Sequence, residues 1–290
     1  MSKEVILIVA DENYVAHAKA LMVGCRNEGE WDGDFCIIMP EGCDGSVFVD
    51  RGVDVLYVPD TGFMAKFHIF STYFRKWESV FYMDCDILIQ GPIRRAFEQL
   101  NNSGAEIICH QEDTAAITSW YTWDKDHNDH QDIYDQLRTE FPLIEERIWN
   151  TAWVLFKPAA FADDLVDQLR ALQTRFAICN PEGEGGTDQQ IIDILLHKRI
   201  TQVADKLFCY WGMDEPQGRV MSEFRGWDGD ETPIMLHYCR WYSPWTKKDA
   251  TADAYIIRRL KRVCYELYTE NLATFDLMFP IKTKDESCEH

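Results

Sequence analysis

Apolar stretches with the composition of strands alternate with amphipathic stretches through about the first 110 residues. The expected strands are rich in β-branched and aromatic residues, and they span Glu4–Ala10, Asp34–Met39, Val53–Val58, Val80–Ile89 and Ala105–Cys109. Helices are predicted between them at Tyr14–Asn27, Met64–Phe74 and Pro92–Leu100. Elements in this order form a mainly parallel, doubly wound sheet, and ligands bind at the carboxyl ends of its strands. We expect Asp11 and Asp84 at two such ends.

The remainder of the chain continues the α/β pattern less regularly. It predicts helices at His130–Phe141, Pro158–Ile178, Asp188–His197 and Ala250–Thr269, and strands at Trp149–Phe156 and Ile234–His237. No repeat, low-complexity tract or linker rich in proline and serine interrupts it. We therefore expect one α/β domain over residues 1–248 and a C-terminal helical extension over residues 249–290.

The segment Val80–Pro92 places two aspartates at the end of a hydrophobic strand. Asp84 and Asp86 are separated by one residue, and side chains two apart in extended chain point the same way. Two neighbouring carboxylates repel each other and are costly to desolvate. A divalent cation removes both problems, and hard cations such as Mg²⁺ prefer carboxylate oxygen. The alternative is a strand that ends in two solvated aspartates at a turn.

Charge and cysteine usage limit the classes of partner. The formal net charge is −20, with 49 acidic and 29 basic residues, so the chain repels nucleic acid and anionic lipid. Ten scattered cysteines without a C-x-x-C pair predict reduced thiols rather than a zinc site. The first apolar run, Val5–Ala10, is too short for a signal peptide or membrane span. We expect a cytoplasmic protein with no transmembrane segment and no nucleic-acid partner.

A second candidate site lies late in the chain, where the apolar run Pro233–Leu236 ends at His237. A histidine after a strand is usually structural. Here a dense aromatic patch and a Pro-Trp pair follow, which is typical of the rim of a binding site.

The order of these features resembles the retaining nucleotide-sugar glycosyltransferases of family 8, which include glycogenin and bacterial galactosyl- and glucosyltransferases. The resemblance covers about Glu4 to Trp245 and implies a single, Rossmann-like GT-A domain with a mostly parallel mixed sheet. It is carried by Ala10-Asp11-Glu12-Asn13-Tyr14, by Lys66-Phe67 before the Asp-x-Asp strand, by Asn150-Thr151-Ala152, by Asp188-Gln189, and by His237 followed by Pro244-Trp245.

The resemblance implies a role for each matching residue. The ligands of a catalytic Mn²⁺ (or Mg²⁺) would be Asp84, Asp86 and His237. The uridine would contact Ala10, Asp11, Asn13 and Tyr14, with the Cys85 backbone facing the nucleotide and Lys66 near the phosphates and the sugar. The donor sugar would be bound by Asn150, Asp188 and Gln189, of which Gln189 would lie near the attacking acceptor.

These roles imply metal-dependent transfer of a hexose from a UDP-sugar to a hydroxyl acceptor on a glycan, a protein or a small molecule. Retention of configuration rests on the resemblance alone, and front-side attack and double displacement both stay open. The pattern departs from the family at Ala152 and Arg240, which replace glycines, and at Ser243, which replaces a lysine that contacts the diphosphate. Arg240 or Lys247 are candidates to replace that lysine.

Two other functions remain as alternatives. A sugar nucleotidyltransferase would also use a carboxylate at a strand end, but it would need a Gly-rich phosphate loop after the first strand, which Asp11–Tyr14 is not. A sugar-nucleotide-binding protein with weak or lost turnover would fit the changes at Ala152 and Ser243.

Two further features of the sequence give weaker indications of function. Glu112 and Asp113 form a second acidic pair that is a candidate for contact with the sugar. The last helix carries Arg258, Arg259, Lys261 and Arg262 among acidic residues, which favours packing on the body or in a homodimer over docking on a membrane.

Overall fold

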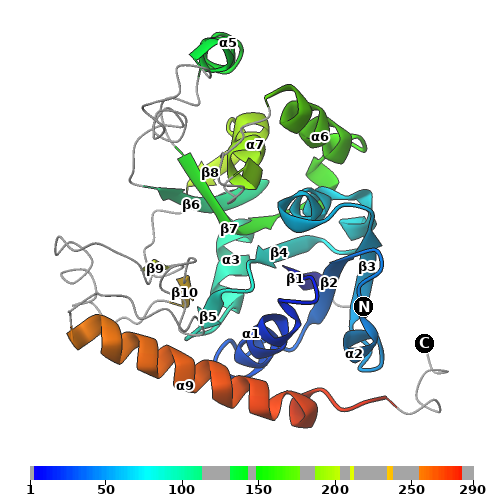
Figure 1. Ribbon diagram of the computed structural model, residues 1–290, viewed down its shortest axis with the longest axis vertical. Coiled ribbons are helices and arrows are strands. Elements are labelled where there is room, and N and C mark those ends of the chain that lie inside the picture. The colour runs from blue at the N-terminus through cyan, green and yellow to red at the C-terminus, as the bar shows by residue number, and fades with distance from the viewer. Residues whose placement is uncertain are drawn as a thin grey trace.

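A computed structural model of the protein describes residues 3–112, 131–142, 148–176, 187–202, 210–211, 234–237 and 255–282 (Figure 1). A seven-stranded sheet has the order β3-β2-β1-β4-β7-β6-β8. Its strands are β1 (Glu4–Val9), β2 (Asp34–Pro40), β3 (Asp54–Val58), β4 (Ser79–Met83), β6 (Ile107–Glu112), β7 (Ile148–Phe156) and β8 (Ile200–Gln202). A three-stranded sheet has the order β5-β10-β9 and consists of β5 (Ile87–Ile89), β9 (Tyr210–Trp211) and β10 (Met235–His237).

Helices cover both faces of the large sheet. The α-helices are α1 (Val15–Asn27), α2 (Ser46–Val49), α3 (Arg94–Ser103), α5 (Gln131–Glu140), α6 (Leu165–Arg175), α7 (Thr187–Leu196) and α9 (Tyr255–Met278). Three 3-10 segments are η1 (Gly62–Phe70), η2 (Thr72–Lys76) and η5 (Pro158–Ala160). The mixed sheet confirms the predicted α/β class, because four neighbouring strand pairs are parallel and only the two pairs formed by β7 are antiparallel.

The strands read as continuous apolar runs because both faces of the sheet are buried. In β1, Ile6 and Ile8 pack into one core with α1, α3 and α9, while Val5 and Leu7 pack into another with η1, α6 and α7. Each core therefore takes alternate residues of the same strand, as the pleat requires.

One predicted strand, Val80–Ile89, is two strands in the structure. β4 ends at Met83 and belongs to the large sheet, whereas β5 begins at Ile87 and pairs antiparallel with β10 in the small sheet. The three residues between them form a turn in which the Ile87 N–H donates to the Asp84 carbonyl at 3.3 Å. Both strands are buried, so the apolar run looks uninterrupted although the chain leaves one sheet and enters another.

Two predicted helices are also divided. Met64–Phe74 is replaced by η1 and η2, which are separated by the extended residue Ser71, whose hydroxyl accepts the Tyr73 N–H at 3.2 Å. Pro158–Ile178 is replaced by η5 and α6, and α6 begins only at Leu165. In both cases the apolar spacing is helical, but local breaks split the segment.

The last helix packs on the body, as its acidic surroundings predicted, and it extends beyond the predicted end at Thr269 to Met278. Figure 1 shows α9 running beside α1. Contacts of the last turns explain this extension. The buried ring of Phe275 packs edge-on against Phe48, with 6.5 Å between the ring centroids. Next to it, Arg51 forms an ion pair with Asp276, with 2.7 Å between nitrogen and oxygen. The side chains of the basic cluster and the boundary near residue 249 lie outside what the structure describes.

None of the helices in the described ranges combines the length and the apolar character that a membrane span needs.

A charged cluster, formed by Asp60, His68 and Arg170, holds η1 against α6. The Asp60 carboxylate contacts His68 Nε2 at 2.5 Å and accepts a hydrogen bond from Arg170 Nε at 3.2 Å. Burial opposes ionisation, but hydrogen bonds from Arg170 and His68 hold the pKa of Asp60 below its ordinary value of 3.8. The Asp60 cluster therefore connects three parts of the fold: the segment just after β3, the segment η1 and the helix α6.

Removal of a core ring should test the packing. Phe81 is fully buried between Phe97 and Trp153, and the centroid of its ring lies 5.8 Å from the centroid of each of these two rings. We expect Phe81→Ala to lower the free energy of unfolding, measured in urea, by about 3–5 kcal/mol. The control Leu277→Ala, at a side chain that is 82% exposed, should change it by less than about 0.5 kcal/mol.

The Asp60 cluster predicts a specific dependence on pH. Because the folded-state pKa of Asp60 is lowered, its contribution is complete above pH 3.8 and is lost as the pH falls through the folded-state value. At pH 7 we expect Asp60→Asn to lower the free energy of unfolding by about 1–3 kcal/mol. The difference from the wild type should shrink in urea titrations below pH 3.8. A difference that stays constant down to the lowest pH would contradict this role.

Candidate active site

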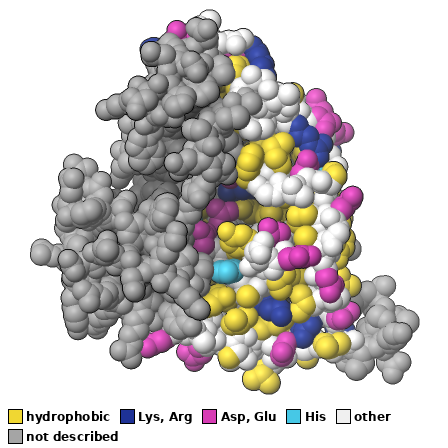
Figure 2. Space-filling model, in the orientation of Figure 1, with side chains coloured by type: hydrophobic (Ala, Val, Ile, Leu, Met, Phe, Trp, Pro, Cys, Tyr) yellow, Lys and Arg dark blue, Asp and Glu magenta, His cyan; other side chains and the backbone are white. Residues whose placement is uncertain are grey.

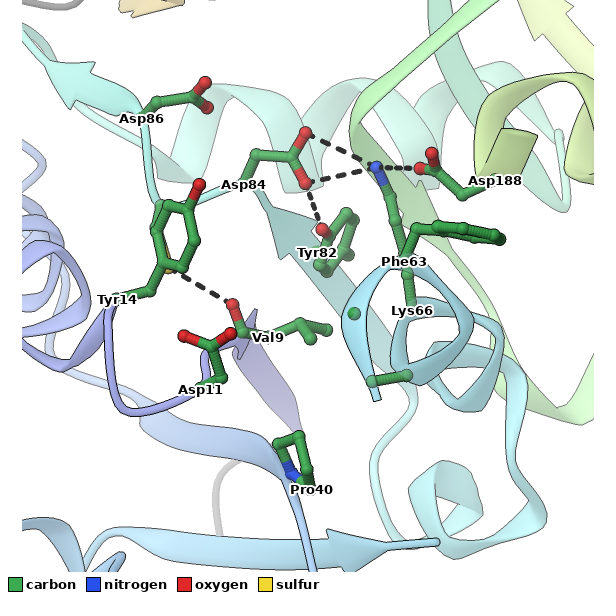
Figure 3. A pocket seen from close by; sticks show the side chains of 13 residues that line it. Val9, Asp11, Tyr14, Pro40, Phe63, Lys66, Tyr82, Asp84, Asp86 and Asp188 are labelled. Atoms are coloured by element: carbon green, nitrogen blue, oxygen red, sulfur yellow. Dashed lines mark hydrogen bonds and ion pairs between the residues drawn. The ribbon is translucent and has the colours of Figure 1, made fainter. Parts of the chain in front are cut away.

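A pocket of about 370 Å³ opens at the carboxyl ends of β1, β2 and β4 (Figure 3). Its size falls in the range of ~300–1,000 Å³ that is typical of small-molecule sites. In the view of Figure 2, acidic side chains gather beside a basic one near the middle of the face. The described residues that line it are Val9, Asp11, Tyr14, Pro40, Gly62, Phe63, Ala65, Lys66, Tyr82, Asp84, Cys85, Asp86 and Asp188. The pocket therefore lies at the edge of the sheet where the sequence predicted a site.

The Asp84–Asp86 turn is fixed to the strands on both sides of β4. The backbone N–H of Asp84 donates to the Ala152 carbonyl in β7 at 2.7 Å. The buried Cys85 thiol donates to the Val9 carbonyl in β1 at 3.2 Å. Burial, together with the neighbouring aspartates, raises the pKa of this thiol well above its ordinary value. Cys85 is thus a neutral structural group that anchors the turn.

The pairing of β5 with β10 brings His237 to the two aspartates. His237 lies opposite Ile87, the residue after Asp86, and its Nε2 lies 3.3 Å from Asp86 Oδ1. One ligand atom from each of Asp84, Asp86 and His237 lies within 4.8 Å of the others. We call these three side chains the cation site.

The cation site fits a divalent cation. Asp86 Oδ1 is buried and accepts no well-aligned hydrogen bond among the described residues, and His237 Nε2 lies 3.3 Å from it. A buried carboxylate oxygen without a donor is costly, and a bound cation would satisfy it. Two carboxylates and one imidazole are suitable ligands for Mn²⁺ or Mg²⁺.

Lys66 joins the cation site to Asp188. Its ammonium group is buried and lies 3.1 Å from Asp84 Oδ1 and 2.8 Å from Asp188 Oδ2. Burial alone would lower the pKa of Lys66, but the carboxylates of Asp188 and Asp84 raise it above its ordinary value. Burial also raises the pKa of Asp84, although Lys66 opposes this shift. Asp188 stands in the first turn of α7, where the helix dipole favours a negative charge.

The stretch after β1 forms a tight turn at the other side of the pocket. The Asp11 carboxylate accepts the Asn13 N–H at 2.8 Å, and the Asp11 carbonyl accepts the Tyr14 N–H at 3.0 Å. Asp11 and Tyr14 line the pocket, and the Tyr14 ring, which is 47% exposed, rises toward Asp86 in Figure 3. Ala10 is buried, and its N–H donates to the Ile38 carbonyl at 3.0 Å.

Besides Ala10 and His237, three predicted residues are not among the described residues that line the pocket. Asn150 is buried in β7, where its side-chain oxygen accepts the Ala152 N–H at 2.8 Å. Gln189 is half-buried next to Asp188 at the start of α7, and Asn13 is exposed in the turn after β1. The roles suggested for these three residues stay predictions.

Several predicted residues lie outside the described part of the chain. They are Asp113, Arg240, Ser243, Trp245 and Lys247, and the side chain of Glu112.

Two aromatic residues in the pocket were not predicted. Tyr82 donates a short hydrogen bond to Asp84 Oδ1, and its ring lies under the Lys66 ammonium, 5.1 Å from ring centroid to nitrogen. Its position two residues before Asp84 placed both side chains on one face of the strand, which is a signal that sequence reasoning can use. Phe63, in η1, is 38% exposed at the rim, and no sequence pattern singles it out.

Comparison with known proteins identifies the fold. No family model and no curated protein matches the sequence. Among solved structures, the glycosyltransferase GlyE from Streptococcus pneumoniae TIGR4 superposes with a TM-score of 0.59 at 16% identity, covering 98% of this chain and 66% of GlyE. The chain therefore spans slightly less than two-thirds of the length of GlyE.

Two further structures show the same similarity. The galactosyltransferase LgtC, solved with donor and acceptor sugar analogs, gives a TM-score of 0.59 at 12% identity, with 97% of this chain and 98% of LgtC covered. The bifunctional glycosyltransferase WbbM gives 0.59 at 14% identity, with 94% of this chain and 50% of WbbM covered. The predicted resemblance is thus confirmed at the level of the fold: this chain has the GT-A fold of glycosyltransferases such as LgtC.

Proposed function

We propose that this protein is a metal-dependent glycosyltransferase that moves a hexose from a UDP-sugar to a hydroxyl acceptor. The observation that carries the proposal is the convergence of Asp84, Asp86 and His237 within 4.8 Å beside a pocket at the carboxyl edge of the sheet. The GT-A fold supports the same reaction class, since GlyE, LgtC and WbbM are glycosyltransferases.

The cation site would hold Mn²⁺ (or Mg²⁺) through Asp84, Asp86 and His237. When bound, the ion would act as a Lewis acid on the diphosphate and stabilise the negative charge that develops on the leaving UDP. This local positive charge matters in a protein with a net charge of −20, whose overall field repels a nucleotide sugar.

The protein side chains supply orientation and a fixed charge. Asp11 and Tyr14 would contact the uridine at one side of the pocket, and Asp188 would accept hydrogen bonds from sugar hydroxyls at the other. Lys66 stays protonated because of its two carboxylate partners, so it would keep a positive charge between the cation site and the sugar. The family resemblance implies that Asn150 and Gln189 would also contact the donor sugar.

The acceptor would be a glycan, a protein or a small molecule with a free hydroxyl, and transfer with retention is proposed from the family resemblance. A cytoplasmic location is proposed from the sequence, whose ten scattered cysteines predict reduced thiols.

Metal dependence can be tested by incubating the protein with a panel of UDP-sugars and measuring UDP release. We expect release with Mn²⁺ and none with EDTA. Asp86→Asn should lower the rate by about 100-fold or more, because a cation ligand is lost. The control Asp163→Asn, at a side chain that is 81% exposed and paired with Arg75, should leave it unchanged.

No release with any donor, in a folded protein that still binds UDP, would favour a sugar-nucleotide-binding protein over an enzyme. Equal release with Mn²⁺ and with EDTA would contradict the role of the cation site.

The sugar-binding role of Asp188 has a separate test. Asp188→Asn keeps an oxygen that can accept from Lys66 but loses the charge that strengthens hydrogen bonds to hydroxyls. We expect transfer to fall by roughly 10- to 100-fold, while the affinity for UDP, measured by calorimetry, stays within about threefold of the wild type. An equal loss of UDP affinity and transfer would indicate that Asp188 acts through the nucleotide or the fold instead.

A further inference from the structure

We infer that Tyr82 is a positioning residue for the cation site. Its hydroxyl holds one carboxylate oxygen of Asp84 and so fixes the orientation of this carboxylate relative to Asp86 and His237. The inference rests on the proposed function, because it assumes that these three side chains bind a divalent cation.

The Tyr82 ring is held rigidly. It is 2% exposed, and its backbone lies in β4 between two strands, opposite Leu7 of β1 and Val154 of β7. A strand paired on both sides cannot shift without breaking hydrogen bonds in two ladders. The phenol oxygen therefore has an almost fixed position relative to the turn that begins at Asp84.

The hydroxyl distinguishes between the two oxygens of Asp84, whereas Lys66 does not. Lys66 Nζ lies 3.1 Å from Oδ1 and 3.3 Å from Oδ2, so the ammonium contacts both almost equally. The Tyr82 hydroxyl donates to Oδ1 alone. In Figure 3 both oxygens of Asp84 face Lys66, and one of them also contacts the Tyr82 hydroxyl. Tyr82 thus makes the two oxygens of Asp84 unequal and fixes how the carboxylate plane is turned.

The ring also supports the lysine that shares this carboxylate. The Lys66 nitrogen lies 5.1 Å from the centroid of the Tyr82 ring, within the range of a cation–π contact. One buried side chain therefore contacts both Asp84 and the ammonium group that joins Asp84 to Asp188. Groups that orient metal ligands in this way typically change metal affinity about 10- to 100-fold when they are removed.

The variant Tyr82→Phe removes the hydroxyl and keeps the ring. Without the hydroxyl, Lys66 is the only described side chain that holds the Asp84 carboxylate, which can then turn about its last bond. We expect the dissociation constant for Mn²⁺ to rise about 10- to 100-fold, measured by electron paramagnetic resonance of free Mn²⁺ with no sugar donor present. The ring volume is unchanged, so circular dichroism should verify that the variant is folded.

The matched control is Tyr73→Phe. It removes a hydroxyl that accepts a hydrogen bond from Lys76 at 2.9 Å in η2, outside the described lining of the pocket. Its affinity for Mn²⁺ should equal that of the wild type. Asp86→Asn serves as the variant in which a ligand itself is lost, and it should bind more weakly than Tyr82→Phe.

The outcomes separate this inference from the proposed function. If the wild type binds Mn²⁺ and Tyr82→Phe binds it equally well, the positioning role is overturned and the proposed function stands. If the wild type and both variants fail to bind Mn²⁺, both are overturned. A loss of affinity in Tyr82→Phe that Tyr73→Phe does not share supports the role of the hydroxyl.

Discussion

The buried ammonium group of Lys66 connects three segments that are far apart in the sequence. It belongs to η1 and contacts Asp84, which follows β4, and Asp188, which opens α7. Moving an ammonium out of water costs several kcal/mol, and only close counter-charges offset that cost. The pocket therefore keeps its shape only while all three segments stay together. The Asp60 cluster acts in the same direction, because it ties η1 to α6.

Much of the large sheet could be predicted from the sequence, because its signal is local. A strand buried on both faces reads as a short apolar run, and β1, β2 and β3 each appear within one or two residues of the predicted ends. The antiparallel direction of β7 could not be predicted, since it depends on pairing with β4 and β6. The break between β4 and β5 was missed for a related reason. An apolar run indicates that its residues are buried, but it does not indicate in which sheet they lie.

The candidate site shows the same division between residue type and geometry. The motif pattern identified Asp84, Asp86 and His237, yet their approach depends on the pairing of β5 with β10 across almost 150 residues of chain, which periodicity does not show. Lys66 was expected near phosphates, but its two carboxylate contacts appear only in three dimensions. Tyr82 was within reach of a simple strand argument, because it shares a face with Asp84.

The position of the Asp84–Asp86 turn between two sheets has a mechanical consequence. Asp84 follows the large sheet, whereas His237 belongs to the small one. An ion bound by both residues would act as a removable cross-link between the sheets, and its binding free energy would add to the stability of their contact. The small sheet would then be held most firmly when the ion is bound, so loading the site and ordering the edge of the pocket would be one coupled event.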